Sequence, residues 1–371
     1  MDIELIIENL PNNGNVTSPI PLRIIVPYVC VQCLAIITGV IGNVLVVGAV
    51  ALEKSLRNAG NIFILNLAIA DLWVTGFIDP FSVVGALTGE EFFLLRPALC
   101  DFIGCTCVTT CMCSIYSIAA ISVQRYIHIC HHSTHDTIFT KRNGILMCCG
   151  LWTACFFIEA PNFFGWGAHE YDQKQLMCML DRSRLSYSYF FIGLGVGVPT
   201  FVIGLSYLKI YLHVSKQRAK VNAHLSRQEK ELKRRERDSA RLTRTLFIIF
   251  IVYALCWLPY AIISTVDVHD TFALEFHLYS ILFAHINSCF NSVIYGLTNT
   301  NFRRGYRRFL CLDRGEQRMD ASFSESSAAT LKSNNATYQM DQLNVVGPAK
   351  AQNGCSGSVH SIPASEMKIC S

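Results

Sequence analysis

Seven long apolar stretches alternate with shorter polar segments along most of the chain. Each is long enough to cross a bilayer as a helix, which takes about 20 predominantly apolar residues. Strands of a membrane barrel need only about ten residues that alternate in polarity, so runs this long and continuous predict helices. The predicted spans are residues 24–50, 61–84, 98–129, 144–164, 187–212, 242–265 and 276–299.

This pattern divides the chain into four parts. An N-terminal tail, residues 1–23, precedes the helical bundle of residues 24–299. Residues 300–312 interleave basic and apolar side chains, which is typical of an amphipathic helix on a membrane surface. Residues 313–371 are rich in Ser, Ala, Asn and Gln without periodicity, so we expect a disordered tail. The expected fold class is an all-α membrane protein, a seven-transmembrane helix bundle with a short eighth helix.

Composition supports the membrane assignment. Of 371 residues, 51% are hydrophobic and 16% are charged, whereas soluble globular proteins carry about 25% charged residues. The chain contains no Ser-His-Asp set, phosphate loop or metal cluster that would indicate an enzyme. Its basic residues cluster between apolar runs instead of covering one face, which argues against a nucleic-acid partner.

The basic clusters predict the orientation of the bundle. They lie in the segments 51–60, 130–143 and 213–241 and directly after the seventh stretch, all on one side of an alternating topology. Positive loops face the cytoplasm, so we expect a multi-pass plasma-membrane protein with an extracellular N-terminus and a cytoplasmic C-terminus. The sequon Asn15-Val16-Thr17 would then be open to glycosylation.

Asp71 is a carboxylate in the middle of an apolar run, where it must be neutralised, paired or solvated. One interpretation is a site for a hard monovalent cation or ordered water; the other is a protonated Asp in a hydrogen-bonded core. Oxygen atoms from other helices could complete the shell, from Ser114, Asn287, Ser288 and Asn291.

The 17 cysteines lie mostly inside apolar runs, where we interpret them as small buried hydrophobic residues. A metal site would need convergent Cys and His ligands. Cys30 and Cys33 have a Cys-x-x-Cys spacing, but no matching His pair faces them in the sequence.

Motifs on all seven predicted helices, in order along residues 24–312, resemble those of the rhodopsin-like (class A) G-protein-coupled receptors. They are Gly42-Asn43, Leu67-Ala68-Ile69-Ala70-Asp71, Gln124-Arg125-Tyr126, Trp152, Pro199 with Tyr207, Cys256-Trp257-Leu258-Pro259 and Asn291-Ser292-Val293-Ile294-Tyr295.

The resemblance implies roles for several of these residues. Cys100 would form a disulfide with Cys178, and Asp71 would belong to a sodium pocket in which the ion is an allosteric modulator and no other cofactor is required. Cys311 would be a palmitoylation site. The residues that rearrange when a G protein binds would be Arg125, Tyr207 and Tyr295.

The resemblance also implies partners: a heterotrimeric G protein, a small-molecule ligand, membrane lipid, and arrestin with receptor kinases. Two departures bear on regulation. Gln124 replaces the usual acid beside Arg125, and Ser292 replaces the usual proline. Together they suggest raised basal activity, so an orphan or constitutively active receptor is one alternative. A membrane transporter is a second alternative, although the chain shows no internal repeat.

Within this family the inner segments resemble the melatonin receptor subfamily, in residues 56–63, 125–131 and 291–303. Cys107 stands where aminergic receptors carry an Asp, and residues 276–299 lack the Lys that a retinal receptor needs. Arg182 and Gly195 depart from the melatonin pattern, whereas Asn162 matches it.

We therefore expect a largely apolar pocket for a small, neutral, lipophilic ligand and signalling through the inhibitory G-protein class. The predicted pocket residues are Cys107, Val108, Cys111, Asn162, Phe191, Trp257, Tyr260, Ser264, Ile281 and His285.

Overall fold

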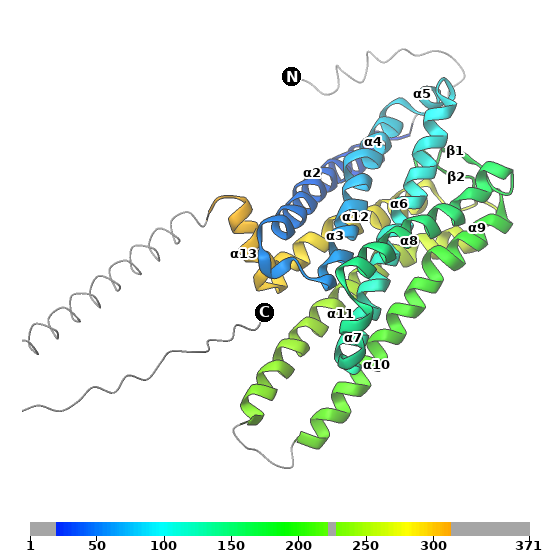
Figure 1. Cartoon of the computed structure of the whole chain (residues 1–371). Helices are drawn as coiled ribbons and strands as arrows, with labels where there is room; N and C mark the ends of the chain where they lie inside the picture. The colour runs from blue at the N-terminus through cyan, green and yellow to red at the C-terminus, as the bar shows by residue number, and fades with distance from the viewer. Residues whose placement is uncertain (1–19, 222–227, 313–371) are drawn as a thin grey trace, which may run out of the picture. The chain divides into compact units, whose positions relative to one another are not determined.

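The computed structural model describes residues 20–221 and 228–312. Side chains are described for these residues except in the segment 217–246. The tail unit, residues 313–371, and the sequon at Asn15 lie outside the described residues. Across the described ranges the chain is almost entirely helical, with one two-stranded hairpin (Figure 1). Every predicted span falls within a helical segment, except that the last helix ends one residue before 299.

Within the described ranges, six helical segments are long and apolar enough to cross a membrane. Two of them are interrupted by a π-helical turn and one ends in a 3-10 turn. The first is α2 (Leu22–Leu52), and the second consists of η2 (Ala59–Asn61), α3 (Ile62–Trp73), η3 (Val74–Ile78) and α4 (Asp79–Thr88). The third is α6 (Pro97–Cys130), and the fourth consists of α8 (Lys141–Glu159) and η4 (Ala160–Phe164). The fifth consists of α9 (Leu185–Ile192), η5 (Gly193–Gly197) and α10 (Val198–Val221), and the sixth is the second half of α11 (Gln228–Val266).

The remaining long helix, α12 (Leu274–Thr298), is less apolar than these six segments. Many of its polar side chains are buried inside the bundle. It packs against both α11 and α2, so these polar groups face protein instead of lipid. The buried polar residues are His277, Ser280, His285, Asn287, Ser288, Asn291 and Ser292.

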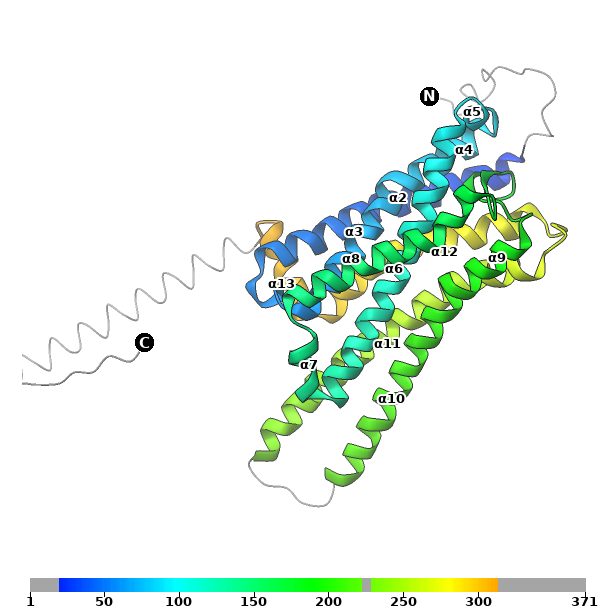
Figure 2. The ribbon, with the colours of Figure 1, turned by 45° about the vertical axis from the view of Figure 1, so that its right-hand side comes forward.

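Short elements mark the two ends of the bundle. At one end, called here the hairpin end, β1 (His169–Asp172) pairs antiparallel with β2 (Met177–Leu180). The other end, called here the α13 end, carries α13 (Thr300–Phe309) and α7 (His132–Ile138) (Figure 2). The remaining short elements are η1 (Lys54–Leu56) and α5 (Glu91–Leu94).

The helix α6 contacts α3, α8, α10 and both hairpin strands, so it connects most of the bundle. One buried amide joins three of these helices. The Asn66 amide of α3 donates to the Ser117 hydroxyl of α6 at 2.8 Å and accepts from the Trp152 indole of α8 at 2.9 Å. A polar group in an apolar bundle needs such partners, because no water is present to replace them.

The two π-helical turns free backbone carbonyls that side chains then satisfy. In η5 the Leu194 carbonyl accepts from the Tyr116 hydroxyl at 2.9 Å, and the Val196 carbonyl accepts from the Thr200 hydroxyl at 2.6 Å. The Tyr253 hydroxyl of α11 lies 2.9 Å from the Thr200 hydroxyl. The turn is therefore held by side chains from two neighbouring helices.

The helix α13 is amphipathic. Phe302 is buried and its ring stacks on Tyr295, whereas Arg303, Arg304, Arg307 and Arg308 are exposed. A Cβ atom added at Gly305 would lie 2.5 Å from the Ala49 Cβ of α2, so glycine permits this close contact. Cys311, which follows the helix, is exposed.

Candidate functional site

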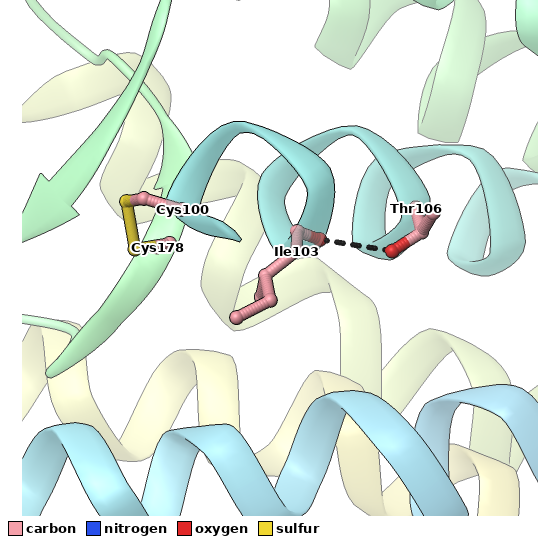
Figure 3. Close-up of a disulfide and its surroundings, with 4 residues drawn as sticks. All are labelled: Cys100, Ile103, Thr106 and Cys178. Atoms are coloured by element: carbon pink, nitrogen blue, oxygen red, sulfur yellow. Dashed lines mark hydrogen bonds between the residues drawn. A yellow bond between two sulfur atoms is a disulfide. The ribbon is translucent and has the colours of Figure 1, made fainter. Parts of the chain in front are cut away.

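The hairpin is tied to the bundle by a disulfide between Cys100, in the first turn of α6, and Cys178 on β2. Figure 3 shows this bond. Further along the same helix, the Thr106 hydroxyl donates to the Ile103 carbonyl, one turn before it. The disulfide was predicted from the family resemblance and is confirmed. It holds the buried strand β2 against α6, which contributes three of the ten predicted pocket residues.

A set of ion pairs joins the hairpin to the loop between α11 and α12. The Arg182 guanidinium contacts Asp172 on β1 at 2.6 Å and Asp270 in that loop at 2.9 Å, and donates to His277 Nδ1 at 2.9 Å. Lys174 adds a contact to Asp270 at 3.2 Å. Arg182 thus links the hairpin to the loop between α11 and α12. The sequence showed only that Arg182 departs from the melatonin-receptor pattern and did not predict this structural role.

Because Arg182 donates to Nδ1, the His277 proton sits on Nε2 and is donated to Asp267 at 2.7 Å. Burial alone would raise the pKa of the Asp267 carboxyl. The backbone N–H of Phe272, the His277 imidazole and Thr271 outweigh that effect and hold this pKa below its usual value of 3.8. Asp267 is therefore ionised and fixes the conformation of the loop.

A second buried network surrounds Glu159, which is fully buried. Its carboxylate lies 2.6 Å from His169 Nε2 and accepts from the Asn162 amide at 2.8 Å. The Tyr187 hydroxyl donates to the neighbouring Ile158 carbonyl at 3.0 Å. Sequence reasoning identified Asn162 but missed His169, whose imidazole is a natural partner for a buried acid.

The third buried carboxylate, Asp79, lies 2.7 Å from His285 Nδ1. The other ring nitrogen of His285 is 3.7 Å from the Cys107 thiol. Neither Asp79 nor Glu159 is exposed to water. Each carboxylate instead has an imidazole partner from another segment of the chain, which removes the need for water.

Nine of the ten predicted pocket residues are buried, and Ser264 is half-buried. Several of the nine carry polar groups that define chemistry for a ligand. The Asn162 Oδ1 and Trp257 Nε1 atoms lack partners among the described residues, and His285 contacts Asp79 and Cys107. The Trp257 ring packs edge-on against Tyr260 at 6.1 Å between centroids.

Below these residues the Asp71 carboxylate accepts from the Ser114 hydroxyl at 2.7 Å and from the Asn291 amide at 2.9 Å. Asp71, Ser114 and Asn291 come from three different helices, as the candidate sodium site requires. Ser288 contributes a further side-chain hydrogen bond to Asp71. Asn287 is buried on the same helix as Ser288 and Asn291.

Toward the α13 end, Arg125 Nε is buried and has no hydrogen-bond partner among the described residues. The guanidinium interacts electrostatically with the phenols of Tyr295 and Tyr207, the two other predicted switch residues. The Gln124 amide nitrogen lies 3.4 Å from His135 of α7. Arg125 has no carboxylate within ion-pair distance in the part of the chain whose side chains are described.

Comparison with known proteins explains this arrangement. Residues 42–295 match the profile of the 7 transmembrane receptor (rhodopsin family). The chain belongs to the rhodopsin family of seven-transmembrane receptors. The protein is therefore a multi-pass membrane receptor that couples to a G protein, and it is not an enzyme.

Relatives place the receptor close to the melatonin receptors. It is 31% identical to melatonin receptor type 1C of Gallus gallus, over 82% of this chain and 87% of the relative. It is 29% identical to melatonin receptor type 1A of Ovis aries, over 81% of each chain. The crystal structure of squid rhodopsin shares the fold, with a TM-score of 0.70 at 22% identity over 82% of this chain and 92% of that one.

The geometry at Asp267 generates a prediction. Asp267→Asn should lower the unfolding temperature of the purified receptor by about 2–4 °C, because the loop loses a charged hydrogen-bond acceptor. A carboxyl whose pKa is lowered by folding stabilises the folded state at any pH above its usual pKa. That stabilisation is lost only as the pH falls through the lowered pKa of the folded state. The difference should therefore stay constant between about pH 6 and 8.

Thermal unfolding followed by a thiol-reactive dye would measure this difference. Asp101→Asn, an exposed carboxylate at the same end, is the matched control and should leave the unfolding temperature unchanged. An Asp267→Asn receptor as stable as the wild type would contradict the assigned role.

Proposed function

We propose that the receptor binds a small, neutral, lipophilic ligand from outside the cell and activates a heterotrimeric G protein of the inhibitory class, as a melatonin-like receptor. The observation that carries the ligand assignment is the pairing of the outer carboxylates. Asp79 and Glu159 each hydrogen-bond to a buried imidazole. Neither is the open counter-charge that a cationic amine would need.

The orientation follows from chemistry at the two ends. The disulfide at the hairpin end requires an oxidising compartment, which supports an extracellular position for that end. Exposed arginines on α13 suit the anionic inner leaflet at the other end. We propose that the exposed thiol of Cys311, which follows α13, carries a lipid anchor there.

Two buried polar atoms without partners among the described residues support a neutral ligand. Asn162 Oδ1 can accept one hydrogen bond and Trp257 Nε1 can donate one, and neither has a partner among the described residues. A flat, weakly polar molecule with one N–H group and one acceptor oxygen would satisfy both. Similarity to receptors named for melatonin supports that ligand as the first to test.

Signalling would begin when ligand binding favours a bundle in which α11 moves outward at the α13 end. Arg125 is suited to this change, because no described carboxylate holds it in the present arrangement. The inner segments that resemble melatonin receptors support inhibitory coupling. The lack of a described carboxylate partner for Arg125 also favours a second candidate function, a receptor with high activity in the absence of ligand.

We also propose that Asp71 binds sodium as an allosteric ion. Ser114 and Asn291 already direct polar groups at the carboxylate, and a Ser114 hydroxyl and an Asn291 amide can turn to present oxygen. Sodium would favour the arrangement in which these helices stay together.

The central prediction concerns melatonin. In cells expressing the receptor, melatonin should lower forskolin-raised cyclic AMP, and Arg125→Ala should abolish that fall while leaving surface expression unchanged. A fall that needs both melatonin and Arg125 supports the proposal. A fall that needs Arg125 but no melatonin favours the constitutive alternative, and no response removes both melatonin and inhibitory coupling.

A second prediction concerns Gln124. Gln124→Asp places a carboxylate beside Arg125 and should lower ligand-free nucleotide exchange about two- to fivefold, the effect of an ion pair worth about 0.5–1 kcal/mol. Gln124→Asn keeps the position neutral and is the control. Exchange that is equal in the two variants would show that the missing acid does not set basal activity.

A third prediction tests the ion. Replacing sodium by N-methylglucamine should raise ligand-free nucleotide exchange of the wild type about fivefold or more, a coupling energy typical of allosteric sites. Asp71→Asn should show no such difference between the two salts, and Asp101→Asn should behave as the wild type. A wild type insensitive to sodium would remove the ion from the mechanism.

A further inference from the structure

Two thiols and an imidazole converge among the proposed pocket residues. Cys107 and Cys111 are four residues apart on α6, so they share one face of that helix. His285 comes from α12. One ligating atom from each of the three residues lies within 4.8 Å of the others, and all three side chains are buried.

The spacing suits a metal ion. The Cys107 sulfur lies 3.7 Å from His285 Nε2. In a tetrahedral zinc site, bond lengths of about 2.3 Å to sulfur and about 2.0 Å to nitrogen separate two such ligands by about 3.6 Å. The thiol and the imidazole are thus already at the separation that zinc would impose.

Asp79 completes the arrangement. Its Oδ1 accepts from His285 Nδ1 at 2.7 Å, which leaves the lone pair on Nε2 directed at the thiols. Carboxylates hold metal-binding histidines in the same way and increase their basicity. Asp79 Oδ2 is buried without a partner among the described residues, and a nearby cation would stabilise that unpaired oxygen.

The other convergent group in the described chain lacks these properties. Asp267, Asp270 and His277 also bring ligating atoms together. However, Arg182 and Lys174 already supply positive charge to these residues. His277 Nε2 carries a proton that it donates to Asp267, so no lone pair points at the centre.

We propose that Cys107, Cys111 and His285 bind a zinc ion inside the ligand pocket, with Asp79 as the residue that positions the imidazole. Soft thiolates with an imidazole are ligands that zinc prefers. Binding releases the two thiol protons in exchange for one divalent cation, so the net charge of the cluster is unchanged. Three protein ligands leave a fourth position open, for water or for a lone pair of the receptor's ligand.

The test uses purified full-length receptor, stripped of metal and kept under argon, titrated with zinc against a chromogenic chelator. The wild type should bind one more equivalent than a variant carrying Cys107→Ser and Cys111→Ser. Cobalt should give the intense visible bands of a tetrahedral thiolate site only in the wild type. Asp79→Asn should keep the stoichiometry but weaken zinc affinity about 10- to 100-fold.

Cys113→Ser is the matched control, because Cys113 is a buried free thiol on the same helix that faces Asn66 at 3.5 Å. It should retain the wild-type zinc equivalent. His285→Gln tests the site without altering either thiol and should lose that equivalent too. If the double cysteine variant and His285→Gln unfold normally on heating yet match the wild type in zinc stoichiometry and cobalt spectrum, the proposal is overturned.

Only the open fourth position rests on the proposed function, because metal binding is read without ligand or G protein. A receptor that binds zinc but ignores melatonin would refute the ligand assignment alone. One that responds to melatonin with no cysteine-dependent zinc would refute the metal site alone.

Discussion

A charged or polar group inside a bundle that excludes water must find its partner in the protein, and this constraint organises the receptor. Asp71, Asp79 and Glu159 are all fully buried. Each contacts a side chain from a different segment of the chain. The hydrogen bonds therefore specify which faces of the helices meet, which apolar packing between helices in lipid would leave less defined.

The two ends of the bundle meet this requirement in different ways. At the hairpin end a disulfide, the Arg182 ion pairs and the Asp267 hydrogen bonds satisfy nearly every group they involve. Toward the α13 end, Arg125 Nε and the Tyr295 hydroxyl are buried without partners among the described residues. Unsatisfied groups lower the cost of rearrangement, so conformational change is favoured where the receptor would meet a G protein.

Hydropathy predicted the helices well, because lipid imposes a length and a composition on each span. The disulfide came from the family resemblance. Pairings between helices were not predictable, since periodicity gives the face of a helix but not its neighbour or its depth. The convergence of Cys107 and Cys111 with His285 was not predictable for the same reason, because the two cysteines are one helical turn apart and His285 lies far along the chain.

The π-helical turn at Gly193–Gly197 has an evolutionary consequence. It accommodates one extra residue within an otherwise continuous helix, and carbonyl groups freed there are satisfied by Tyr116 and Thr200. Loss of a single residue from the turn would rotate α9 by about 100° relative to α10. Descendants of this gene could thus present a new set of side chains to the ligand by one codon deletion, while the half that signals keeps its register.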